Sequence, residues 1–181
     1  SPGLLYAATF GRGVWVVSLY SNVPTPLSSF SVTGATKCED TSIPFTDLST
    51  NSPTAWSWSV NPSAGVLISS PTAQNPVITF PNGGNYTVSV VASNSVGPGN
   101  TYTQVVNITS LPNLIISNSN QGVCTGSSVT FNASGASTFT WSNGGGNLSM
   151  ATYTPLSNTV YTLSGAIGSC ASTTVCSVVV Y

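Results

Sequence analysis

The sequence predicts an all-β protein built as two tandem β-sandwiches preceded by a β-hairpin. Short runs of Val, Ile, Thr and aromatic residues alternate with clusters of Gly, Pro and Asn, and no stretch spaces its apolar residues as a helix does. One pattern of Cys, Phe, Trp and Tyr occurs twice along the 181 residues. Because 40% of the residues are hydrophobic, each copy can bury a core of its own. We expect a hairpin over residues 1–25, one sandwich over 26–111 and a second over 112–181.

The first twenty residues predict a hairpin that belongs to neither sandwich. Two apolar runs, 4–10 and 14–20, flank the turn Gly11-Arg12-Gly13. An isolated two-stranded hairpin is marginally stable in water, so one of its faces must be buried, either on the adjacent sandwich or against a neighbouring molecule. The residues expected at a contact with another subunit are Phe10, Arg12, Val14, Trp15 and Val17.

The repeated pattern gives the two sandwiches equivalent aromatic positions. In the first copy it consists of Cys38, Phe45, Trp56, Trp58 and Tyr86. In the second copy it consists of Cys124, Phe131, Phe139, Trp141 and Tyr161. Side chains alternate between the two faces of a strand, so Trp58 and Trp141 are each expected at the centre of a core. Trp56 lies nearer the start of its strand and can reach the surface.

Charged side chains are almost absent, which argues against catalysis. The chain has two basic and three acidic residues, no His and a net charge of −1. Acid–base, nucleophilic and metal-dependent catalysis draw on His, paired carboxylates, Lys or activated Cys. We therefore expect no enzyme: no catalytic residues, no metal and no cofactor. With so few basic residues, the chain has no positively charged surface with which to bind nucleic acid. No apolar run approaches the roughly 20 residues of a membrane span.

The three carboxylates, Glu39, Asp40 and Asp47, lie within nine residues of one another. Carboxylate oxygens are the ligands that Ca²⁺ prefers, so a calcium site is one interpretation. The other interpretation is structural, with Asp47 capping a turn before Leu48 and with Glu39 and Asp40 in a solvated loop beside Lys37. We favour the structural interpretation.

Residues 27–110 resemble a PKD domain. The resemblance is carried by residues 45–49 (Phe-Thr-Asp-Leu-Ser), 56–58 (Trp-Ser-Trp) and 84–88 (Gly-Asn-Tyr-Thr-Val). The acidic Gly-Asp-Gly turn that usually follows the second Trp is missing, and residues 61–65 read Asn-Pro-Ser-Ala-Gly instead.

Residues 112–181 are similar to the Ig-like repeat of large secreted and surface proteins of Bacteroidetes. The similarity rests on residues 124–131 (Cys-Thr-Gly-Ser-Ser-Val-Thr-Phe), 140–142 and 161–163. Residues 10–15 (Phe-Gly-Arg-Gly-Val-Trp) resemble the closing strands of a sialidase-like or BNR-type β-propeller blade. This resemblance implies that the hairpin is the remnant of a propeller that lies upstream in a longer parent protein, an origin that is compatible with docking on a neighbouring molecule. Together these resemblances imply two Ig-like sandwiches in a non-catalytic spacer, adhesin stalk or appendage of a secreted enzyme, often exported by type IX secretion.

Four cysteines without metal-type C-x-x-C spacing favour disulfides in an oxidising, extracellular setting. The resemblance to Ig-like repeats implies a bond between Cys124 and Cys170, which would join the first core strand to the segment before the last strand. Cys38 and Cys176 are then left to form an interdomain bond, to form an intermolecular bond or to stay reduced.

Composition and resemblance together predict a non-catalytic structural or adhesive module of a secreted bacterial protein, located outside the cell or on its surface. Bare strand edges and a nearly neutral surface permit one subunit to pack on the next. We expect self-association into a fibre, filament or stalk through β-strand packing between subunits. The alternative is a carbohydrate-binding accessory module of a secreted glycoside hydrolase, with a polysaccharide stacked on an aromatic side chain such as Trp56 or Trp15.

Overall fold

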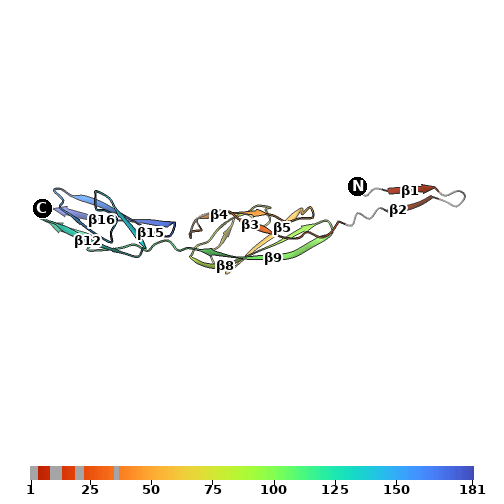
Figure 1. The fold of residues 1–181 in the computed structure, drawn as a ribbon, viewed down its shortest axis with the longest axis horizontal. Helices are drawn as coiled ribbons and strands as arrows, with labels where there is room; N and C mark the ends of the chain where they lie inside the picture. Colours follow the sequence, from red (N-terminus) through yellow and green to blue (C-terminus); the bar gives the residue numbers. More distant parts are fainter. Residues whose placement is uncertain (1–3, 9–13, 19–22, 35–36) are drawn as a thin grey trace.

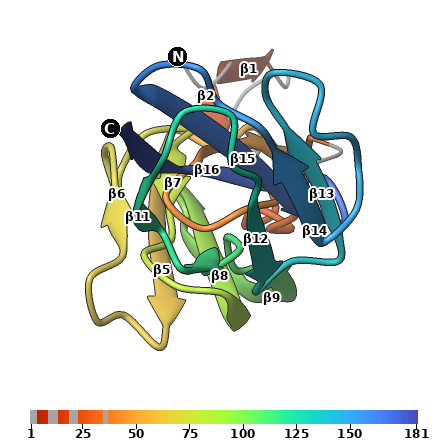
Figure 2. The same cartoon turned by 90° about the vertical axis from the view of Figure 1, so that its left-hand side faces the viewer.

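The computed structural model describes residues 4–8, 14–18, 23–34 and 37–181, and every regular element in these ranges is a β-strand. The strands are numbered β1 to β16, and β3 to β16 form two sandwiches that lie end to end along the long axis of the molecule (Figure 1). Viewed along that axis, the second sandwich lies in front of the first (Figure 2). The predicted all-β fold class is confirmed.

The first sandwich has the strand order of a constant-type immunoglobulin domain. Its four-stranded sheet contains, in order, β3 (Phe30–Val32), β4 (Ser42–Asp47), β7 (Val77–Thr79) and β6 (Leu67–Ile68). Its three-stranded sheet contains, in order, β5 (Ala55–Asn61), β8 (Gly84–Asn94) and β9 (Gly97–Ile108). In chain order these are strands A-B-E-D and C-F-G, the arrangement that defines the constant-type fold.

The second sandwich, described over residues 112–181, follows the same plan without a counterpart of β6 and with one additional pairing. One sheet contains, in order, β10 (Ile115–Ser117), β12 (Val129–Ser134) and β14 (Met150–Tyr153). The other contains, in order, β11 (Asn120–Val123), β16 (Cys170–Val180), β15 (Thr159–Ile167) and β13 (Thr138–Trp141). Here β11 runs parallel to β16 and covers its outer edge, whereas the equivalent strand of the first sandwich, β9, is an edge strand. The prediction of two tandem Ig-like sandwiches is therefore confirmed.

The hairpin ahead of them consists of β1 (Leu4–Ala8) and β2 (Val14–Ser18). The two strands are antiparallel, with Leu4 opposite Ser18 and Ala8 opposite Val14. Within the part of the chain that the structure describes, they form a separate two-stranded sheet and pair with no strand of either sandwich.

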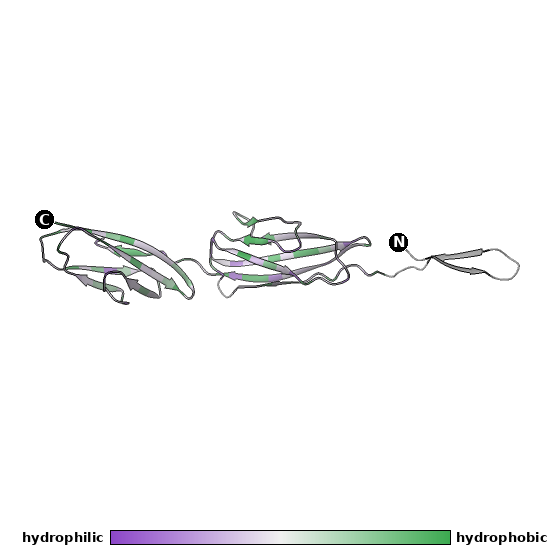
Figure 3. Ribbon diagram, turned by 90° about the horizontal axis from the view of Figure 1, so that it is seen from above, coloured by the Kyte–Doolittle hydropathy of each residue, from purple (hydrophilic) through white to green (hydrophobic). Residues whose placement is uncertain are grey.

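Alternation along the strands builds one core in each sandwich, and Figure 3 shows polar and apolar residues taking turns along the arrows. Trp58 is 3% exposed and Trp141 is 4% exposed, each at the centre of its own cluster of buried residues. The indole Nε1 of Trp58 donates a hydrogen bond to the Ala73 carbonyl at 2.9 Å, and that of Trp141 donates to the Leu148 carbonyl at 3.0 Å. A buried indole N–H needs a hydrogen-bond acceptor, and in both sandwiches a backbone carbonyl provides it.

Candidate functional site

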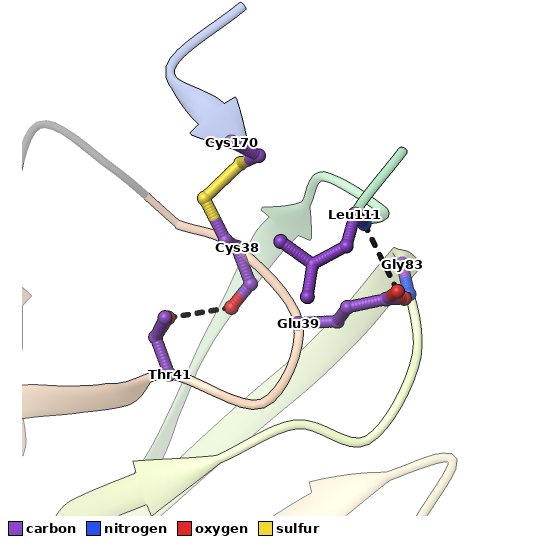
Figure 4. Close-up of a disulfide and its surroundings, with 6 residues drawn as sticks. All are labelled: Cys38, Glu39, Thr41, Gly83, Leu111 and Cys170. Carbon is purple, nitrogen blue, oxygen red and sulfur yellow. Dashed lines mark hydrogen bonds between the residues drawn. A yellow bond between two sulfur atoms is a disulfide. The ribbon is translucent and has the colours of Figure 1, made fainter. Parts of the chain in front are cut away.

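Two of the four cysteines and one of the three carboxylates lie at the junction between the two sandwiches. Cys38, Glu39 and Gly83 come from the first sandwich, and Leu111 comes from the connecting segment, residues 109–114 (Figure 4). Cys170 begins the last strand of the second sandwich. We call this group of five residues the junction clasp.

A disulfide between Cys38 and Cys170 is the covalent part of the clasp. Their Cα atoms lie 5.6 Å apart, which is the usual span of a disulfide, and both residues are buried. Cys38 is held against the end of β9, because Thr109 donates to the Lys37 carbonyl at 2.7 Å and accepts from the Glu39 N–H at 3.0 Å. The bond therefore joins a fixed point on the first sandwich to the start of β16 on the second.

The predicted bond between Cys124 and Cys170 is wrong. Cys124 follows directly on β11, and β11 pairs with the far end of β16, with Val123 opposite Val180. At about 3.3 Å per residue along a strand, ten residues separate that point from Cys170 by about 33 Å, several times the reach of a disulfide. Cys38 does form an interdomain bond, but its partner is Cys170 and not Cys176.

Glu39 is the polar part of the clasp. Its Oε2 accepts the backbone N–H of Gly83 at 2.7 Å, and its Oε1 accepts that of Leu111 at 2.9 Å. One carboxylate thus ties the connecting segment to a turn of the first sandwich, and charge-assisted bonds of this kind are stronger than neutral ones. The expectation that Glu39 lies in a solvated loop is wrong, because these two contacts leave it only partly exposed.

The connecting segment is held on the other side as well. Ser172 of β16 donates its hydroxyl to the Pro112 carbonyl at 2.6 Å. At Gly83 the segment passes so close that a Cβ would collide with the backbone and side chain of Ser110. The segment is therefore fixed to both sandwiches rather than being a free linker.

Asp47 is the last residue of β4, and its side chain caps the segment that follows, in agreement with the predicted capping role. Its Oδ1 accepts the backbone N–H of Ser49 at 3.1 Å and the Ser49 hydroxyl at 2.6 Å. Its Oδ2 accepts the Gln74 amide at 3.2 Å. Among the described residues, no group of His, Cys, Asp and Glu side chains is arranged to hold a metal ion.

The other two cysteines have different surroundings. Cys176 is buried in the second core opposite Tyr161, and burial raises the pKa of its thiol. Burial also raises the pKa of Tyr153 and of Tyr161. The neighbouring Tyr161 and Cys176 raise the pKa of Tyr153 further, whereas a hydrogen bond with Thr159 partly offsets the rise at Tyr161. Cys124 is exposed, and neither Cys124 nor Cys176 forms a disulfide in this structure. A buried thiol with a raised pKa is a poor nucleophile, so Cys176 is a core residue rather than a reactive one.

The structure describes the predicted glycan contact Trp56 in full, whereas it describes the predicted interface residues of the hairpin only in part. Trp56 is partly buried and packs against the first core, and its indole Nε1 is buried without a hydrogen-bond partner. Phe10 and Arg12 lie outside the described residues. Val14, Trp15 and Val17 lie in β2, whose backbone pairing is described but whose side chains are not.

The disulfide is explained by strand direction, which the spacing of the cysteines does not give. Cys38 and Cys124 occupy the same place in the repeated pattern, so spacing favoured neither of them. Cys170, however, begins the last strand of its sandwich, and that strand starts at the end facing the first sandwich. Glu39 could not have been found in this way, because its two partners lie 44 and 72 residues away along the chain.

No helix in the described ranges has the length and apolar character needed to cross a membrane.

No family model matches the sequence, and no curated protein matches it either. Solved structures with similarity include a domain of intimin, with 14% identity, a TM-score of 0.39, and coverage of 84% of this chain and 100% of that one. An I-band fragment of titin has 12% identity and a TM-score of 0.40 over 87% of this chain and 66% of that one. Extracellular domains 3–5 of Drosophila OTK have 13% identity and a TM-score of 0.41 over 86% of this chain and 62% of that one. Likeness at this level carries no argument about function, so the fold assignment rests on the strand order given above.

Proposed function

We propose that this chain is a non-catalytic structural or adhesive module of a secreted bacterial protein, acting outside the cell as part of a stalk or fibre. The observation that carries the proposal is the junction clasp, in which a disulfide joins the two sandwiches and a carboxylate holds the connecting segment against the first of them. Disulfides persist in oxidising compartments, which supports an extracellular location.

The finer assignments follow from the same proposal. The module consists of a hairpin segment over residues 1–25, a PKD-like sandwich over 26–111 and a Bacteroidetes-type Ig-like sandwich over 112–181. Type IX secretion is the export route that this combination suggests. Two of the three carboxylates are used in backbone contacts, at the junction and at the Asp47 turn, which supports a structural rather than a catalytic use of the few charges.

Assembly between subunits would proceed by strand packing. Among the residues that the structure describes, β9 pairs only with β8 along its length, and a single bridge between Cys38 and Thr109 covers its end. A long uncharged edge strand is a template for pairing with another chain. The hairpin of a second copy is the proposed occupant, with Phe10, Arg12, Val14, Trp15 and Val17 at the contact, because a two-stranded sheet gains stability when it joins a larger one.

Analytical ultracentrifugation and negative-stain microscopy of the purified chain test this proposal. We expect concentration-dependent oligomers or filaments, and we expect their loss when residues 1–22 are deleted. Monodisperse particles of the full chain at all concentrations would contradict assembly, and turnover of any substrate by the purified chain would contradict the non-catalytic assignment.

A further inference from the structure

We propose that the Cys38–Cys170 bond is a mechanical shortcut that carries tension past both sandwiches. This inference rests on the proposed function of a stalk, in which tension is the working load. Tension that enters before Cys38 and leaves after Cys170 has two covalent routes, one through residues 39–169 and one through the disulfide. The disulfide is far shorter, so it becomes taut first.

On the second sandwich the load runs along one strand. β16 starts at the bridged Cys170 and ends one residue before Tyr181. A strand already rises about 3.3 Å per residue, while a fully stretched chain reaches at most about 3.6 Å. Its eleven residues therefore lengthen by only about 3 Å when pulled straight. The load stays in the covalent backbone of β16, and its hydrogen bonds to β15 and β11 are not sheared.

On the first sandwich only the segment before Cys38 is exposed to load. This segment contains β3, which pairs with β4 from Phe30 opposite Asp47 to Val32 opposite Phe45, and an isolated bridge between Leu27 and Thr50. These are the contacts that tension can strip. The 16 residues from Val23 to Cys38 span at most about 54 Å when stretched.

Everything between the two cysteines is protected. The bond spans a sequence separation of 132 residues, which includes every strand from β4 to β15. At about 3.5 Å per residue, this part of the chain holds about 460 Å of stretched length that cannot be released while the bond is intact. A chain that unfolds under load without the bond would lengthen by that amount more than a chain with it.

Single-molecule force spectroscopy on the full chain, held before Ser1 and after Tyr181, tests the shortcut. C124A/C176A keeps the bond and removes the other two thiols, and C38A/C170A removes the bond. Before the tether breaks, the bridged variant is expected to lengthen by less than about 150 Å, including the opening of the hairpin. The unbridged variant is expected to show separate unfolding steps for the two sandwiches, with a total about 460 Å greater.

A second comparison covers the case in which C38A/C170A folds poorly. C124A/C176A is stretched with and without a thiol reductant, and reductant is expected to release the same additional length from the same polypeptide. A step of more than about 200 Å from the oxidised bridged variant would overturn the proposal, as would equal lengths with and without reductant.

This outcome is independent of assembly. If the chain forms no oligomers but the oxidised variant stays short, the shortcut stands and the fibre proposal fails. If filaments form but the oxidised chain unfolds to full length, the shortcut alone fails.

Discussion

At the residue scale, the few charged groups of this chain matter because of where they are placed. Glu39 accepts hydrogen bonds from two backbone N–H groups, one at Gly83 in the first sandwich and one at Leu111 in the connecting segment. A carboxylate between two such donors cannot be replaced by an apolar group without leaving both donors unpaired. The neighbouring Asp40 is exposed and has no side-chain partner in the described part of the chain, so the two acids offer a matched comparison.

Replacing Glu39 with Ala is expected to loosen the junction and to destabilise the first sandwich by about 2 kcal/mol. A hydrogen bond to a charged group contributes about 1.5–3 kcal/mol, and the partial exposure of Glu39 places the combined loss of its two bonds near the lower end of that range. Thermal unfolding measures the loss, and amide hydrogen exchange should speed up most at Gly83 and Leu111. D40N is the control and should change neither quantity. Equal effects of E39A and D40N would show that net charge, and not the two contacts, matters here.

The buried thiol of Cys176 makes the second sandwich sensitive to high pH. Burial raises its pKa above the ordinary value of 9.0, so the unfolded chain loses this proton at a lower pH than the folded chain does. Ionisation then stabilises the unfolded state, and the free energy of unfolding falls as pH rises above about 9. Tyr153 and Tyr161 act in the same direction above about pH 10, because their pKa values are also raised.

Urea unfolding at several pH values between 7 and 10.5 tests this expectation. In a C124A background, the additional change C176A should reduce the decrease in stability between pH 8 and 10 and leave the tyrosine contribution above pH 10. If stability decreases equally in the two proteins over that lower interval, the thiol is not responsible.

At the element scale, the two sandwiches differ most in how the last strand is covered. β16 is an inner strand between β15 and β11, whereas β9 is an edge. Val105 on β9 and Val175 on β16 are both exposed, at 62% and 60%, so a lysine at either position is solvated. Only the lysine on β9 would stand on a free edge, where charge discourages strand addition.

V105K is therefore expected to weaken self-association at least tenfold while leaving the unfolding midpoint nearly unchanged. V175K is the matched control and should associate as the unmodified chain does. Sedimentation velocity over a range of concentrations gives the comparison, and equal behaviour of the two variants would contradict pairing at β9.

Strand identity could be predicted from this sequence, but the pairing of distant elements could not. Period-two alternation and the repeated aromatic pattern predicted the hairpin and the burial of Trp58 and Trp141, because these properties depend on local spacing. The parallel contact of β11 with β16 and the bond from Cys38 to Cys170 depend on strand direction and on the order of the two sandwiches. The spacing of four cysteines leaves three pairings open, and the family resemblance favoured one that the strand register excludes.

At the scale of the whole molecule, the disulfide couples the stabilities of two sandwiches that have separate cores. If one sandwich unfolds while the other stays folded, its chain is a closed loop, fixed at the connecting segment on one side and at the disulfide on the other. Such a loop has about 60–75 residues, and its closure opposes the first unfolding event by about 4 kcal/mol. When both have unfolded, the whole loop has a sequence separation of 132 residues and the total effect is about 5 kcal/mol. The second event is thus opposed by only about 1 kcal/mol.

The bond should therefore make unfolding both harder and more cooperative. With C124A/C176A, urea unfolding followed by tryptophan fluorescence is expected to show one transition, with a steep slope that reflects exposure of both cores. With C38A/C170A, or with reductant added to the bridged variant, we expect two transitions at lower urea concentrations, each with a smaller slope. Trp56 and Trp58 both report on the first core and Trp141 reports on the second, so W56F/W58F and W141F versions of each variant assign the transitions to the sandwiches. Unchanged midpoints after loss of the bond would mean that the clasp holds the sandwiches together without stabilising either of them, and the coupling argument would fail.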